Sequence, residues 1–97
     1  MEENFDYIIV GAGSAGCVLA NKLSKNERNS VLLIEAGGKD TNLFIHMPSG
    51  YSQIVPNKND FNYGFETEPE ETTNNRPLYW PRGRGWGGSS SINAMIY

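Results

Sequence analysis

The glycine turn at residues 11–16 constrains the fold of this chain more than any other feature. Its spacing is Gly11-x-Gly13-x-x-Gly16, and it lies between a short apolar run and a run with helical periodicity. Gly11 is suited to a sharp turn off a strand, Gly13 to close approach of a phosphate, and Gly16 to tight packing of helix on strand. The turn therefore predicts a strand and a helix that together meet a dinucleotide. A glycine-rich turn with a purely structural role is the alternative.

The runs on either side of this turn predict a βαβ unit. Residues 6–10 and 31–35 are rich in β-branched and apolar side chains, which predicts two fully buried strands. Residues 14–24 carry apolar side chains at helical spacing. The side chains on that helix face are Ala15, Val18, Leu19 and Leu23. A strand, a helix and a strand within about thirty residues imply parallel neighbouring strands and a right-handed crossover.

Glu35 ends the second predicted strand, and an acid at this position suits the ribose of a bound adenosine. It follows Gly11 at close to the roughly 20-residue offset of the dinucleotide-binding pattern. Ligands bind at the carboxyl ends of parallel strands, so we expect Glu35 at the same sheet edge as the glycine turn. Its carboxylate is expected to face a groove and to have no internal partner. The acid suits FAD or NAD and disfavours the 2′-phosphate of NADP.

The middle of the chain carries weaker patterns. Residues 39–60 mix polar, proline and scattered apolar positions, which predicts a long irregular segment. Residues 62–68 alternate as a half-buried strand does, and residues 77–81 are the expected partner strand of a β-hairpin.

A second glycine-rich loop spans residues 82–91. Its glycines remove side chains, so that backbone N–H groups can approach an anionic or planar ligand. Ser89, Ser90 and Asn93 add hydrogen-bonding side chains. A flexible linker is the alternative, which Trp86 and the apolar run after it disfavour. We predict that residues 87–90 and Asn93 lie beside residues 13–15, because one βαβ turn cannot reach both ends of an extended cofactor.

These segments together resemble the N-terminal part of the glucose–methanol–choline (GMC) oxidoreductases. The resemblance rests on residues 5–16, 34–38, 64–69, 80–83 and 83–93, and so covers nearly the whole chain. Residues 45–48 and 89–95 are closest to the bacterial choline and aliphatic-alcohol dehydrogenases. The implied fold is α/β: a Rossmann-like FAD-binding βαβ unit, an irregular segment and a possible β-hairpin. Residues 1–97 are then expected to be the N-terminal part of the FAD-binding domain of a larger two-domain flavoenzyme, truncated before the substrate domain.

The resemblance implies FAD as the cofactor. Some family members carry a flavin-linked histidine at the position of Ile92, so non-covalent FAD is expected here. Arg82 and Arg84 suit a diphosphate or, equally, a solvated loop. The implied cofactor-binding residues are Gly11, Gly13, Ser14, Ala15, Gly16, Glu35, Ala36, Arg82, Gly85, Gly87, Gly88, Ser89, Asn93, Ala94, Met95 and Ile96.

The family implies oxidation of the CH–OH group of an alcohol, either choline or an aliphatic alcohol, with hydride transfer to flavin. The family's catalytic histidine lies near the C-terminus of full-length members and has no counterpart here, because His46 does not match its motif. No catalytic residue is therefore assigned, and these residues alone are expected to be inactive. The alternatives are a non-catalytic stand-alone dinucleotide-binding module and an inactive gene fragment.

The charge and the apolar content of the chain limit the kinds of partner and compartment that we expect for it. The 97 residues carry 8 Lys and Arg against 11 Asp and Glu, and a net charge of −3 argues against nucleic acid. The N-terminus lacks a signal-peptide n-region, and no apolar run approaches the roughly 20 residues of a membrane span. We expect a cytoplasmic protein; inner-membrane association and oligomeric state stay open. Cys17 is interpreted as a small core residue, and His46 lacks the neighbours of a metal site.

Overall fold

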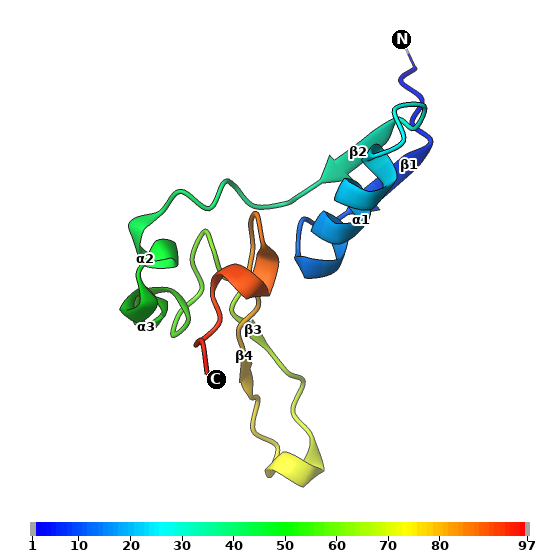
Figure 1. Ribbon diagram of the computed structural model, residues 1–97. Coiled ribbons are helices and arrows are strands. Elements are labelled where there is room, and N and C mark those ends of the chain that lie inside the picture. The colour runs from blue at the N-terminus through cyan, green and yellow to red at the C-terminus, as the bar shows by residue number, and fades with distance from the viewer. Residues whose placement is uncertain (1, 97) are drawn as a thin grey trace.

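A βαβ unit forms one end of the molecule in the computed structural model, which describes residues 2–96 (Figure 1). Strand β1 spans Tyr7–Val10, helix α1 spans Ser14–Ser24, and strand β2 spans Val31–Ile34. The two strands are parallel neighbours, with Tyr7 opposite Val31 and Val10 opposite Ile34. The predicted strand–helix–strand order, the helix bounds and the parallel pairing are confirmed.

Helix α1 packs closely on β1 because Gly16 has no side chain. A Cβ atom at Gly16 would lie 1.9 Å from the carbonyl oxygen of Gly11 and 3.4 Å from Cγ2 of Ile9. Gly11 itself has a φ of +102°, a conformation that side chains with a Cβ rarely adopt. Both glycines therefore act as the sequence analysis predicts for the start of such a unit.

The burial of this unit differs from the prediction. Ile9 is 9% exposed, but Ile8 is 60% exposed and Val10 is 82% exposed. On α1, Val18 is 57% exposed and Leu19 is 51% exposed. The prediction of fully buried strands is wrong for residues 2–96, because these residues place only one helix against a two-stranded sheet. A sheet of this kind needs cover on both faces.

Short helices occupy the segment that was expected to be irregular. Helix α2 spans Leu43–His46, the 3₁₀ helix η1 spans Pro48–Gly50, and α3 spans Tyr51–Ile54. Oδ1 of Asn42 caps α2 by accepting the N–H of Phe44 at 2.8 Å. These four-residue helices are too short to produce a periodic pattern, so the prediction failed here. None of the helices in residues 2–96 combines the length and apolar character needed to cross a membrane.

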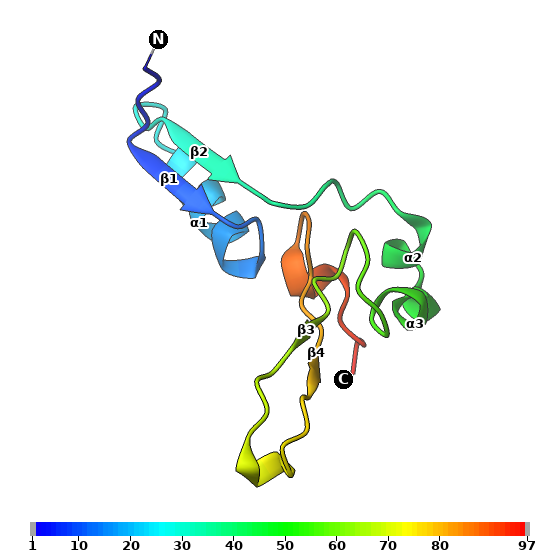
Figure 2. The same cartoon turned by 180° about the vertical axis from the view of Figure 1, so that it is seen from behind.

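The predicted hairpin is present in a shorter form and projects away from the rest of the molecule (Figure 2). Strand β3 spans Phe65–Glu66 and pairs antiparallel with β4, which spans Tyr79–Trp80. A 3₁₀ helix, η2, lies between them at Glu71–Thr73. The chain then returns through the second glycine loop to η3, at Gly88–Ser91.

We predict losses of stability of different size for two alanine substitutions in the glycine turn. Gly16→Ala should lower the free energy of unfolding by about 1–3 kcal/mol or more, because its Cβ would clash with the backbone carbonyl of Gly11. Gly13→Ala should lower it by less than about 1 kcal/mol, because no atom lies within 4 Å of its Cβ position. Chemical denaturation of both variants measures the difference, and equal losses would contradict this packing.

Candidate cofactor-binding site

The carboxylate of Glu35 joins three segments of the chain. Oε2 accepts the N–H of Ala12 at 2.8 Å, and Oε1 accepts the N–H groups of Gly37 and Gly85, each at 2.9 Å. Glu35 thus lies at the same sheet edge as the glycine turn, as predicted. The expectation that its carboxylate has no internal partner is wrong, because the second glycine loop, fifty residues later, donates to it. A carboxylate has about four acceptor positions, so one remains.

The same hydrogen bonds keep Glu35 charged. Burial acts to raise the pKa of its carboxyl group, but backbone hydrogen bonds, with Gly37, Ala12 and Gly85 foremost, outweigh burial. The net pKa lies below its ordinary value of 4.5. At neutral pH the sheet edge therefore holds a fixed negative charge bonded to backbone donors from both glycine loops.

The two glycine loops lie side by side, as predicted (Figure 1). Gly87 donates its N–H to the carbonyl oxygen of Ala12 at 2.7 Å, and the hydroxyl groups of Ser14 and Ser90 are hydrogen-bonded. A Cβ atom at Gly88 would lie 3.0 Å from Cα of Gly13, so the backbones touch where neither residue has a side chain. Segments about seventy residues apart thus form one surface around the start of α1.

A first groove, of about 400 Å³, lies beside Glu35. Its other lining residues are Ala12, Cys17, Leu33 and Trp86. The interpretation of Cys17 as a core residue is wrong: it is exposed, and its Sγ donates to the carbonyl oxygen of Ala12 at 3.3 Å. Sequence reasoning also missed Trp86 as a groove residue. For Cys17 a signal existed, because it lies one helical turn after Gly13 and hence on the same side of α1.

A second groove, of about 380 Å³, lies between α3 and the second glycine loop. Tyr51 and Val55 line it from the helical segment. The predicted residues Arg82, Ser89, Asn93 and Ala94 line it from the loop, together with Pro81 and Ile92. The structure thus brings four of the predicted cofactor residues to one groove.

The two arginines of the second loop face aromatic rings. The guanidinium carbon of Arg82 lies 5.1 Å from the Trp80 ring centroid, and that of Arg84 lies 5.9 Å from the Tyr63 ring centroid. Arg82 also donates to the carbonyl oxygen of Pro81 at 2.7 Å. Their neutralisation of a diphosphate stays a prediction.

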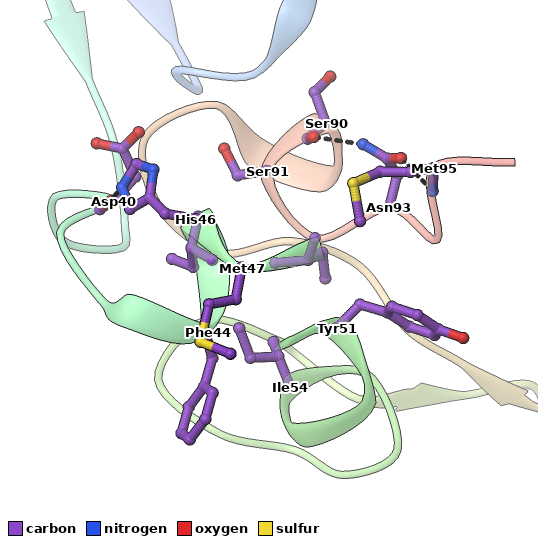
Figure 3. A pocket seen from close by; sticks show the side chains of 12 residues that line it. Asp40, Phe44, His46, Met47, Tyr51, Ile54, Ser90, Ser91, Asn93 and Met95 are labelled. Carbon is purple, nitrogen blue, oxygen red and sulfur yellow. Dashed lines mark hydrogen bonds between the residues drawn. The ribbon is translucent and has the colours of Figure 1, made fainter. Parts of the chain in front are cut away.

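The C-terminal tail borders a third cavity, of about 220 Å³ (Figure 3). Asp40 and His46 lie at one end of it, and Asn93 and Met95 at the other. Asn93 donates to the carbonyl oxygen of Ser90 at 2.6 Å and accepts the N–H of Met95 at 2.6 Å, which folds the tail back on η3. The predicted residues Ile96, which is 93% exposed, and Ala36 lie in exposed positions.

The start of α1 fits the diphosphate of a dinucleotide. The space that a Cβ atom of Gly13 would fill has no protein atom within 4 Å. No side chain caps the helix, and its first turn contains no acidic residue, so the positive end of the helix dipole faces this space. Glu35 lines the adjoining first groove, beside Ala12.

Comparison with known proteins agrees with this arrangement. The sequence model of the GMC oxidoreductase family matches residues 5–97, and the chain therefore belongs to this family of FAD-dependent enzymes. Over 93 residues the chain is 57% identical to an alcohol dehydrogenase [acceptor] of Pseudomonas putida, with 96% of this chain and 17% of that protein covered. It is 53% identical over 97 residues to an oxygen-dependent choline dehydrogenase of Vibrio vulnificus, with 100% of this chain and 17% of that protein covered.

Solved structures of flavoenzymes share the fold. The chain superposes on pyridoxine 4-oxidase from Mesorbium loti with a TM-score of 0.84 and 40% identity, covering 97% of this chain and 18% of that one. An FAD-dependent oxidoreductase from Chaetomium thermophilum gives a TM-score of 0.72 and 33% identity, covering 97% of this chain and 16% of that one. The chain thus spans about one sixth of the length of these proteins.

Glu35→Gln should make the fold less stable at neutral pH than the wild type. Because the folded pKa of Glu35 lies below the unfolded one, the carboxylate stabilises the fold above about pH 4.5. That contribution is lost as the pH falls through the folded pKa, so the difference between wild type and variant should shrink in acid. Urea unfolding from pH 7 to pH 3 measures it, and a difference that stays constant with pH would contradict the assigned role.

Proposed function

We propose that this chain is the FAD-binding portion of a flavin-dependent oxidoreductase that acts on the CH–OH group of an alcohol. In this proposal its βαβ unit begins a Rossmann-like FAD-binding domain, of which residues 1–97 are the N-terminal part. The observation that carries the proposal is the meeting of the two glycine loops across the Glu35 carboxylate. The alcohol and choline dehydrogenases among the relatives support an alcohol, choline or aliphatic, as the substrate class.

The grooves suggest how FAD lies on the chain. The diphosphate is placed at the start of α1, over residues 13–15, where backbone N–H groups and the helix dipole favour phosphate. The adenosine ribose is placed in the first groove, where its hydroxyl groups donate to the remaining acceptor position of Glu35. The flavin end is placed in the second groove, beside Ser89, Asn93 and Ala94.

The side chains around the second groove suit a planar ring held without a covalent bond. Ile92, which is 7% exposed, and Val55 give the groove apolar surface, and neither has a nucleophilic atom. Ser89 and Asn93 supply polar groups at its border. When bound, FAD supplies the hydride acceptor for the alcohol carbon. The residues of this chain bind and orient the cofactor, and none is assigned to proton transfer.

Cys17 offers a direct test of the first groove, because it is the chain's one cysteine and lines the groove. Alkylation of its thiol should slow at least severalfold in the presence of FAD or ADP. A 2′-phosphorylated adenosine nucleotide should protect far less, because Glu35 repels that phosphate. Unchanged alkylation with all three nucleotides would contradict adenosine binding in this groove.

Gly13→Ala should weaken FAD binding by about tenfold or more, because its Cβ occupies the space proposed for the diphosphate. Gly38→Ala is the matched control, since its Cβ also has no atom within 4 Å but lies outside the turn. Equilibrium dialysis with FAD compares the two variants. Equal FAD affinities of Gly13→Ala and Gly38→Ala would contradict the proposed position of the diphosphate at the start of α1.

The substrate class is tested in the full-length enzyme that contains this segment. Anaerobic addition of choline or an aliphatic alcohol should reduce the bound flavin and bleach its visible absorbance. A full-length enzyme that binds FAD but is bleached by no alcohol would contradict the proposed reaction. Binding of ADP without FAD would favour a non-catalytic dinucleotide-binding module.

A further inference from the structure

The side chain of Asn62 is the largest fully buried one in residues 2–96. It is 0% exposed, and it lies between α3 and the returning arm of the hairpin. A buried amide costs free energy unless its polar atoms are hydrogen-bonded, so the hydrogen bonds of Asn62 must offset the cost of burying it.

Asn62 bonds to both sides of the space that it fills. Its Oδ1 accepts the N–H groups of Gly64 at 3.0 Å and Arg82 at 3.1 Å. Its Nδ2 lies within hydrogen-bond distance of four acceptors. These are the carbonyl oxygens of Ile54 at 3.2 Å, Val55 at 3.0 Å and Asn57 at 3.1 Å, and the hydroxyl of Tyr79 at 2.8 Å.

Only one orientation of the amide satisfies these neighbours. The side where Oδ1 lies presents two N–H donors, and the side where Nδ2 lies presents three carbonyl oxygens. A flipped amide would place oxygen against oxygen and nitrogen against N–H. The chain around Asn62 therefore demands a side chain with an acceptor at one end and a donor at the other.

Tyr79 extends this connection from β4. Its hydroxyl donates to the carbonyl oxygen of Val55 at 2.6 Å and accepts from Nδ2 of Asn62 at 2.8 Å. Asn62, Tyr79 and Val55 thus form a closed triangle of hydrogen bonds that joins the end of α3 to the hairpin.

This triangle joins the two walls of the second groove. Val55 and Tyr51 form one wall, and Pro81 and Arg82 belong to the other. Asn62 bonds to the carbonyl oxygen of Val55, in one wall, and to the N–H of Arg82, in the other wall. We propose that Asn62 and Tyr79 are positioning residues that fix the separation of these walls and thereby orient the flavin ring. This inference rests on the proposed function only for the identity of the ring.

Tyr79→Phe tests the proposal mildly, because it removes only the hydroxyl. Amide hydrogen exchange at Arg82 and Gly64 should accelerate by about tenfold, the effect of one hydrogen bond. Exchange at Ala12 and Gly85, which bond to Glu35, should stay unchanged. Tyr63→Phe is the matched control, since it makes the same chemical change on the neighbouring arm of the hairpin.

Asn62→Asp tests it more strongly, because a carboxylate oxygen then faces three carbonyl oxygens. Amide hydrogen exchange at Arg82 and Gly64 should accelerate more in Asn62→Asp than in Tyr79→Phe. In both variants FAD should bind more weakly and show an altered visible circular dichroism band, while ADP affinity stays at the wild-type value. In the proposed arrangement ADP reaches the first groove and the start of α1 but not the second groove, so its affinity separates the two ends of the site.

Two results would overturn the proposal. In one, exchange at Arg82 and Gly64 in Tyr79→Phe equals that in Tyr63→Phe. In the other, exchange at Ala12 and Gly85 rises by the same factor, which would show general loosening rather than control of one groove. If the wild type bound no FAD, the proposed function would fail, while exchange at these amides would still decide whether the triangle holds the walls.

Discussion

The carboxylate of Glu35 is the contact on which the rest of the site depends. It bonds to three backbone donors, from the first glycine turn, from the loop after β2 and from the second glycine loop. Charged acceptors make stronger hydrogen bonds than neutral ones, so one side chain fixes three loops that otherwise lack regular structure. In the proposed function an adenosine ribose bonds to this same carboxylate, which would couple cofactor binding to the stability of the loops.

The parts of the fold that follow from local chemistry could be predicted from the sequence. The spacing of Gly11, Gly13 and Gly16 predicted the turn, and the change from strand to helix periodicity predicted α1 with its observed bounds. The meeting of the two glycine loops was also predictable, because an extended cofactor needs both. Their backbones approach where Gly13 and Gly88 both lack side chains.

Other features depend on contacts that no local pattern reports. The bond from Gly85 to Glu35 joins residues fifty positions apart, so the internal partner of the carboxylate was missed. Helices α2 and α3 have four residues each, fewer than periodicity can detect. Asn62 begins the run that the sequence predicts as a half-buried strand, and the alternation of that run does not mark its amide for burial. It is fully buried because α3 and Arg82 both bond to it. The apolar runs predicted buried strands, but in residues 2–96 only one helix covers them.

The central claim is that one FAD contacts both glycine loops, and a nuclear magnetic resonance titration of backbone amides with FAD tests it most directly. The account predicts that the amides of residues 13–15 and of residues 87–93 shift along one curve with a single dissociation constant. ADP should shift the first set much more strongly than the amides of Asn93 and Ala94. Two different dissociation constants for the two loops, or shifts confined to one of them, would contradict the account.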